Sequence, residues 1–141
     1  FKKVNRQINT DEVAEPNIFA CPVTVAALNE SRDWLDEMNE VVFDNREYVE
    51  KFIKENNPSL SVKRADATYL LWINCKKVSL PSKVFADFLR KEIGLILTDG
   101  TVYGKGGDGY LRMNVACPRK TLLDALNRLK TGTEKFLALN H

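Results

Sequence analysis

The sequence has 141 residues, of which 44% are hydrophobic and 28% charged, with a formal net charge of +2. This length fits one domain with a core of its own, and so small a charge does not support nucleic acid or a membrane surface as a partner. No apolar run approaches the ~20 residues that a membrane-spanning helix needs. Because the chain begins at Phe1 without a Met or a signal-like segment, we expect its true N-terminus to be missing.

The cysteine and histidine content limits which kinds of catalytic group and metal site the chain can have. Cys21, Cys75 and Cys117 are widely spaced and form neither a C-x-x-C metal pair nor a disulfide framework, which favours a reducing cytoplasm. The one histidine is the last residue, His141, which we interpret as part of a frayed end. Serine–histidine and cysteine–histidine catalysis and a histidine zinc site are therefore excluded, and we predict no metal site.

Two helices are predicted in the N-terminal part. Residues 17–28 are mostly apolar and predict a short helix, which packs either on the sheet of this domain or against protein outside this sequence. Residues 31–57 predict a long helix, stopped by Asn57 and Pro58, because apolar residues recur at three- and four-residue steps. These apolar residues are Trp34, Leu35, Met38, Val41, Val42, Tyr48, Val49, Phe52 and Ile53.

The rest of the chain predicts short strands that alternate with helices. Strands are expected at residues 61–64, 68–75, 95–97 and 110–117, a turn at 98–100, and helices at 81–93 and 118–132. The first of these helices has a predicted buried stripe of Val84, Phe85, Phe88, Leu89 and Ile93, with Gly94 as its C-terminal cap. The second is predicted to bury Leu122, Ala125, Leu126 and Leu129 and to end at Gly132.

The order of these elements after the long helix is β-β-α-β-β-α, which predicts an α/β (α+β) fold. We expect a two-layer sandwich, in which helices cover a small mixed or antiparallel sheet. The apolar run at residues 68–75 predicts a central strand that is covered on both faces, or on one face with a domain contact on the other.

The strand at residues 110–117 separates two kinds of side chain. Tyr110, Arg112, Asn114 and Ala116 share one face, whereas Leu111, Met113, Val115 and Cys117 share the other, which is apolar and predicted to face the core. By residue chemistry alone Arg112 is either an ordinary solvated residue or, beside the amide of Asn114, a receptor for a carboxylate.

A resemblance favours the carboxylate receptor. The run G-x-G-G-x-G-[aromatic]-x-R-[Leu/Met]-N-x-A-x-P-R at residues 104–119 resembles the C-terminal signature of class I/II aminotransferases, the fold-type-I pyridoxal-phosphate (PLP) enzymes, and within them the cystathionine β-lyase-like (C–S lyase) branch. In that family the arginine of the R-[Leu/Met]-N triplet binds the substrate α-carboxylate, which implies this role for Arg112. The strand A-T-Y-L-x-W is also similar, with Asn74 where aspartate is usual. On this strand, Tyr69 is expected to be either a residue that lines the active site or an aromatic residue of the core.

The resemblance also implies a domain organisation. Residues 1–28 are expected to be the tail of a missing large domain or a linker, residues 29–133 the small C-terminal domain, and residues 134–141 a frayed tail. The long helix is then the one that bridges the two domains. The family's cofactor contacts and Schiff-base lysine lie upstream, so we expect substrate-binding residues here (Arg112, Asn114 and Tyr69) but no catalytic or cofactor-binding residue, and no activity of this chain alone.

For the full-length enzyme the resemblance implies a cytoplasmic homodimer that uses PLP for C–S β-elimination from cystathionine or a cysteine conjugate, with amino-acid transamination as the alternative. A second alternative is a stand-alone module in which Tyr110, Arg112 and Asn114 bind a nucleotide, against which the near-neutral charge counts.

Two motifs in the sequence are misleading. Residues 82–85, Ser-Lys-Val-Phe, resemble the family's lysine motif. However, Lys83 falls off the apolar stripe of a helix, where a lysine is not desolvated, and we reject it as the cofactor's lysine. Gly104, Gly106 and Gly109 satisfy G-x-G-x-x-G, but a strand follows instead of a helix, so a dinucleotide site is not expected.

Overall fold

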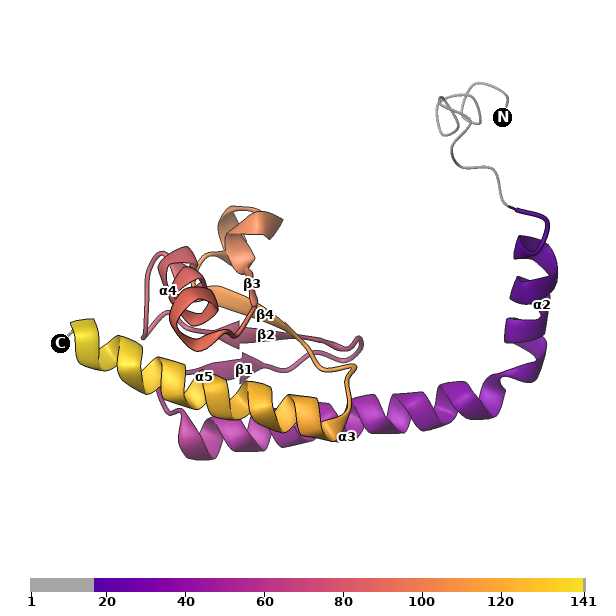
Figure 1. Ribbon diagram of the computed structural model, residues 1–141, viewed down its shortest axis with the longest axis horizontal. Coiled ribbons are helices and arrows are strands. Elements are labelled where there is room, and N and C mark those ends of the chain that lie inside the picture. The colour runs from indigo at the N-terminus through magenta and orange to yellow at the C-terminus, as the bar shows by residue number, and fades with distance from the viewer. Residues whose placement is uncertain (1–16, 141) are drawn as a thin grey trace, which may run out of the picture. The chain divides into compact units, whose positions relative to one another are not determined.

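The structure is a computed structural model that describes residues 17–140, and the chain falls into two compact units, Phe1–Met38 and Asn39–His141 (Figure 1). The expectations for residues 1–16 and for His141 lie outside the described residues. Helix α2, Ala20–Glu30, lies in the first unit, and α3, Arg32–Asn56, begins in the first unit and ends in the second. Both predicted helices are therefore present, close to their expected bounds.

A four-stranded antiparallel sheet forms one layer of the second unit, in the order β1-β2-β4-β3. Its strands are β1 (Ser61–Lys63), β2 (Leu70–Asn74), β3 (Thr98–Asp99) and β4 (Tyr110–Asn114). Strand β2 is central in the sheet, as predicted, and the predicted two-layer fold with a small antiparallel sheet is confirmed.

The strand predicted at residues 95–97 and the turn at residues 98–100 are wrong. Leu95 and Leu97 are buried, but the ladder hydrogen bonds begin later, where Thr98 and Asp99 pair with β4. The backbone N–H of Leu95 instead donates to the carbonyl of Leu89, so this segment still closes the preceding helix. The apolar residues correctly indicated that this segment is buried, but burial alone does not specify strand pairing.

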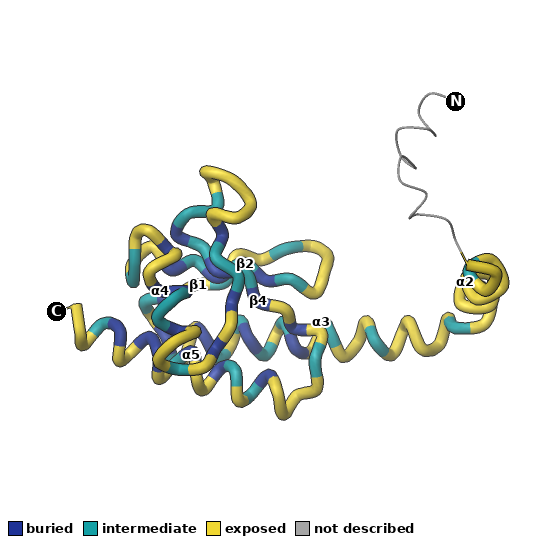
Figure 2. The backbone as a smooth tube through the Cα atoms, turned by 45° about the horizontal axis from the view of Figure 1, so that its top comes forward, coloured by how far each residue is buried: buried dark blue, intermediate teal, exposed yellow. Residues whose placement is uncertain are grey.

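The core lies between the inner face of the sheet and the helices (Figure 2). Leu71 and Ile73 of β2 and Leu111 and Met113 of β4 are buried, and the residues that alternate with them are not. The helices contribute further buried side chains: Val49, Ile53, Phe85, Leu89, Leu122, Leu126, Leu129 and Phe136. The predicted split of the β4 face is therefore confirmed, and only one face of β2 is covered within the described residues.

Helix α4, Ser82–Phe88, continues into a π-helical turn at Leu89–Ile93, and Gly94 follows with a left-handed φ of 70°. The buried stripe holds Phe85 and Leu89 as predicted, but Val84 is 51% exposed, which corrects that prediction. Ser82 is buried in its place. It lies three residues before Phe85 and thus on the same helix face, whereas Val84 is turned about 100° away.

Helix α5, Arg119–Asn140, does not end at Gly132, so the prediction of a helix end and a frayed tail there is wrong. Gly132 is needed for a close contact, because an added Cβ would lie 2.4 Å from Cδ2 of Leu89. One turn later Phe136 is buried, with ring centroids 5.1 Å from Phe85 and 5.2 Å from Phe88. The end of α5 is thus part of the core.

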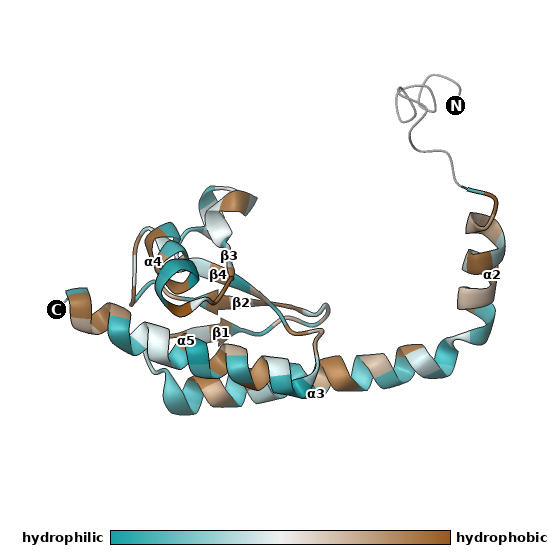
Figure 3. Ribbon diagram, in the orientation of Figure 1, coloured by the Kyte–Doolittle hydropathy of each residue, from teal (hydrophilic) through white to brown (hydrophobic). Residues whose placement is uncertain are grey.

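The N-terminal helices expose much apolar surface. No residue of α2 is buried, and Val23, Val25 and Leu28 are exposed. Figure 3 shows hydrophobic positions, in brown, along this helix. In α3 only Asn45, Val49 and Ile53 are buried, so Trp34, Leu35 and Val41 of the predicted apolar stripe are exposed. What residues 17–28 pack against stays a prediction. None of the helices in residues 17–140 is both long and apolar enough to cross a lipid bilayer.

Candidate functional site

Arg112 lies on the outer face of the sheet, in the middle of β4. The register places Trp72 beside it on β2 and Thr98 beside it on β3, and Lys63 of β1 pairs with Trp72 on the far side. This row crosses all four strands, and both Arg112 and Trp72 are half-buried. The arginine is thus carried by a strand that is hydrogen-bonded on both sides, which fixes its backbone.

An aromatic ring holds the Arg112 guanidinium. The guanidinium carbon lies 4.7 Å from the ring centroid of Tyr103, a cation–π contact. Trp72 contacts Tyr103 edge-on at 5.5 Å and Tyr110 at 6.1 Å. None of the ion pairs among residues 17–140 includes Arg112. No described acid thus competes with an external carboxylate for its donors.

A cavity of about 420 Å³ borders the same aromatic group. It is lined by Lys63, Arg64, Ala65, Trp72, Tyr103, Gly106, Gly107 and Tyr110. Arg64 is 3.5 Å from Glu47 in an exposed ion pair, a kind of contact that contributes little to stability. The cavity is therefore bounded by aromatic rings, glycine backbone and two cationic residues, of which Arg64 is already paired.

The other two predicted substrate-binding residues, Asn114 and Tyr69, lie at one end of the β2–β4 ladder. Asn114 pairs with Leu70, and the backbone N–H of Val115 donates to the carbonyl of Tyr69 at 2.9 Å. The side-chain oxygen of Asn114 accepts from the N–H of Ala116 at 2.8 Å, which leaves its amide hydrogens as the free donors. Tyr69 is 47% exposed, so it is not a core aromatic.

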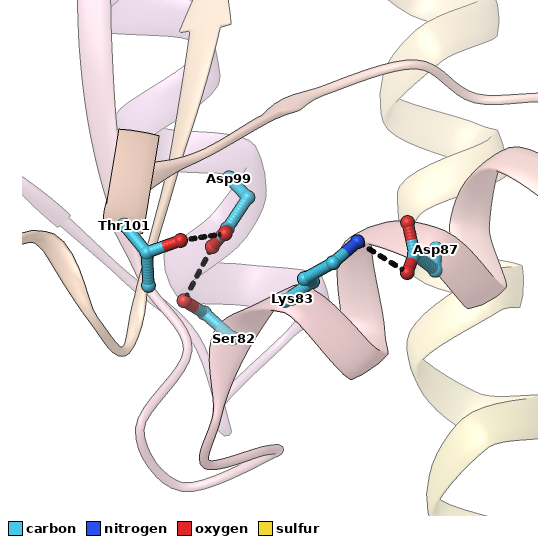
Figure 4. Close-up of polar contacts among 5 residues, drawn as sticks. All are labelled: Ser82, Lys83, Asp87, Asp99 and Thr101. Carbon is cyan, nitrogen blue, oxygen red and sulfur yellow. Dashed lines mark hydrogen bonds and ion pairs between the residues drawn. The ribbon is translucent and has the colours of Figure 1, made fainter. Parts of the chain in front are cut away.

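A hydrogen-bonded group closes the glycine-rich loop at residues 100–107, which contains two short 3-10 turns and carries Tyr103. The hydroxyl oxygen of Ser82 lies 2.7 Å from Asp99 Oδ1 and 3.0 Å from Asp108 Oδ1. Asp108 Oδ1 also accepts the backbone N–H of Ser82 and that of Gly109, both at 2.9 Å. These donors, the Ser82 N–H foremost, hold the pKa of Asp108 below its ordinary value. We call Ser82, Asp99 and Asp108 the Ser82 clasp, and Figure 4 shows its contact between Ser82 and Asp99.

The rejected lysine motif lies beside this clasp. Lys83 is exposed and pairs with Asp87 at 2.7 Å, one turn along α4 (Figure 4). The prediction that it lies off the apolar stripe is confirmed. Of the other lysines in residues 17–140 only Lys130 is half-buried and the rest are exposed, so none has the desolvated surroundings that an imine-forming lysine needs. The described residues thus do not themselves fit an attachment site for PLP.

The cysteines on the inner side of the sheet have raised pKa values. Burial, above all, raises the pKa of Cys75 to about 12, so that its thiol stays protonated and is a poor nucleophile. Burial also raises the pKa of Cys117. Within residues 17–140 no three His, Cys, Asp or Glu side chains gather where they could hold a metal ion.

Sequence reasoning missed several residues of this site. Tyr103 lies in a loop, and the Ser82 clasp joins the start of α4 to residues on either side of that loop, so periodicity along one segment does not identify these partners. Asn45 left a signal, since it occupies an apolar position of the α3 stripe, four residues before Val49. Its amide nitrogen donates to the carbonyls of Val115 at 2.8 Å and Cys117 at 2.9 Å and so anchors the chain just after β4.

Comparisons with known proteins bear on this geometry. No protein-family model matches the chain. Cystathionine beta-lyase PatB of Bacillus subtilis is 33% identical over 116 residues, 82% of this chain and 30% of that protein. The aspartate aminotransferase of Pyrococcus horikoshii is 27% identical over 112 residues, 78% of this chain and 28% of that protein.

A solved structure extends the likeness to three dimensions. The PLP-bound C-S lyase from Staphylococcus hominis has a TM-score of 0.80 and 26% identity, over 94% of this chain and 33% of that one. These likenesses and the fold define a C-terminal domain of the PLP-dependent class I/II aminotransferase family. The chain belongs to the branch of that family with the cystathionine β-lyases and C–S lyases. It spans less than a third of the two curated relatives described above.

Proposed function

We propose that the chain is the substrate-binding small domain of a PLP-dependent C–S β-lyase that acts on cystathionine or a cysteine conjugate. The observation that carries the proposal is Arg112, which is fixed on a central strand, held by an aromatic ring, and not paired with any described acid. In the overall reaction the Cβ–S bond breaks, the thiol leaves, and water converts the remaining three-carbon unit to pyruvate and ammonia.

In this proposal Arg112 grips the substrate α-carboxylate with two parallel N–H donors. Such a charge-assisted pair contributes about 1.5–3 kcal/mol and also fixes the orientation of the substrate Cα–H bond. The free amide hydrogens of Asn114 provide a further donor, and Tyr69 forms a wall at the same end of the strands. PLP, when bound, supplies an electron sink for charge at Cα. The cofactor and its lysine belong to a large domain outside this chain, the partner of the small domain.

The 141-residue chain is accordingly proposed to be inactive by itself. Support comes from its described lysines, all exposed or half-buried. Reductive trapping of PLP on one lysine of this chain with borohydride would contradict the proposal.

We further propose a cytoplasmic homodimer for the full-length enzyme, following the family resemblance, with the three unpaired cysteines as support for the compartment.

The test uses the full-length enzyme and the variant Arg112→Lys, with cystathionine as substrate and pyruvate and free thiol as products. Lysine keeps the charge but loses the bidentate geometry, so KM should rise about ten- to a hundredfold. Arg90→Lys is the matched control, because Arg90 is exposed and away from the outer face of the sheet. An unchanged KM for Arg112→Lys would remove Arg112 from the site.

Transamination is the second candidate, and the likeness to an aspartate aminotransferase favours it. Both reactions require the same carboxylate receptor, so Arg112 does not separate them. Incubation with a substrate and a 2-oxo acid acceptor separates the two reactions. Formation of the acceptor's amino acid without pyruvate or thiol would assign the enzyme to transamination.

A further inference from the structure

The orientation of Arg112 depends on Tyr103. An arginine side chain has several freely rotating bonds, and ordering it costs up to about 2 kcal/mol. Among the described residues, the contact that restrains the guanidinium is the Tyr103 ring, at 4.7 Å. A guanidinium that stacks on an aromatic ring by its flat face still presents its N–H edges to a carboxylate.

Tyr103 itself sits near the tip of a loop and is 49% exposed, so packing alone does not hold it. Trp72 restrains it from the side, edge-on at 5.5 Å with an interplanar angle of 80°. Trp72 belongs to central β2, where it pairs with Arg112. Ring, indole and guanidinium therefore form one group across two strands and the loop.

The neck of the loop is closed by two sets of contacts. The backbones of Gly100 and Gly107 touch, since an added Cβ on Gly107 would lie 1.9 Å from the carbonyl oxygen of Gly100. Beside them, the Ser82 clasp joins the residues that flank the loop, Asp99 before it and Asp108 after it. The single hydroxyl hydrogen of Ser82 is shared between two carboxylates. Thr101 within the loop also donates to Asp99 (Figure 4).

We propose that Tyr103 is a positioning residue for Arg112, and that the Ser82 clasp holds the loop so that the ring stays on the guanidinium. The inference rests on the proposed function, because it concerns how the carboxylate receptor is oriented. It assigns a role to a buried serine on α4, which has no contact with Arg112. The clasp acts through Tyr103 alone.

The test compares variants of the full-length, PLP-loaded enzyme by KM, kcat and the inhibition constant of propionate, an unreactive carboxylate. Tyr103→Leu should raise both KM and the propionate constant about tenfold and change kcat less than threefold, since the lost contact orders the receptor. Tyr103→Phe keeps the ring and should behave as the wild type. Lys83→Ala, an exposed neighbour of Ser82, should also leave all three values unchanged.

Ser82→Ala opens the clasp and should raise KM and the propionate constant in the same direction as Tyr103→Leu, but by less, because Trp72 still restrains the ring. The double variant Ser82→Ala with Tyr103→Leu should be no worse than Tyr103→Leu alone. If Ser82→Ala fails to fold, as judged by its circular dichroism, Tyr103→Leu still decides, because that side chain is exposed.

Unchanged constants for Tyr103→Leu would overturn the inference, as would an equal loss in Tyr103→Phe, which would show that the hydroxyl acts rather than the ring. Failure of the proposed function is distinguishable. In that case Arg112→Lys itself leaves KM unchanged. A raised KM in Arg112→Lys with none in Tyr103→Leu would refute only the positioning role.

Discussion

Truncation of Phe136 to alanine tests whether the end of α5 is part of the folded core. Phe136 is 7% exposed and packs against two other rings, Phe85 and Phe88. Phe→Ala substitutions in cores cost about 3–5 kcal/mol. Because Phe136 lies in the second-last turn of α5, the helix end can partly collapse into the space, so we expect a cost near the lower bound, about 3 kcal/mol.

The assay is urea unfolding of the 141-residue chain followed by circular dichroism. With a slope of about 2 kcal/mol per molar urea, the midpoint should fall by about 1.5 M. Leu139→Ala is the matched control, because Leu139 lies on the same helix but is 74% exposed, and its cost should stay within about 0.5 kcal/mol. An unchanged midpoint for Phe136→Ala, or an equal shift for Leu139→Ala, would refute the reasoning.

Two further predictions concern buried polar contacts of the same chain. Asn45→Leu keeps the number and branching of the side-chain heavy atoms but leaves the carbonyls of Val115 and Cys117 without their donor, so the free energy of unfolding should fall by about 2–3 kcal/mol. Urea unfolding measures it, and a loss under about 0.5 kcal/mol would contradict this. The folded-state pKa of Asp108 is below its ordinary value of 3.8. The ionised carboxylate therefore contributes to the free energy of unfolding above pH 3.8, and this contribution is lost as pH falls through the folded-state pKa. The stability difference between wild type and Asp108→Asn should therefore shrink from pH 6 to pH 3, and an equal difference at both values would contradict it.

Much of the fold follows from local periodicity. The two faces of β4 could be predicted because side chains alternate along any strand, so apolar Leu111 and Met113 identify the core and place Arg112 outside. The position of Arg112 on the outer face could therefore be predicted without knowing which residues surround it. In the same way, the three- and four-residue steps of α3 predicted its length to within a residue at each end.

Features that depend on a distant neighbour could not be predicted. In the sequence alone Gly132 indicates a helix end. In the structure its lack of a side chain leaves room for Leu89, and the helix continues. Val84 is as apolar as Phe85, and only the direction from which the core approaches α4 decides that Ser82 is buried instead.

The amino-acid sequence by itself determined most of the elements, the face of β4 that carries Arg112, and the resemblance on which the proposed role of this arginine rests, because these depend on spacing along one segment. Only the tertiary structure decided what surrounds the arginine. Tyr103 and Trp72 come from a loop and a strand far apart in the chain, and they meet at Arg112 because β2 pairs with β4. Ser82 comes from a helix and contacts the residues on either side of that loop, Asp99 and Asp108.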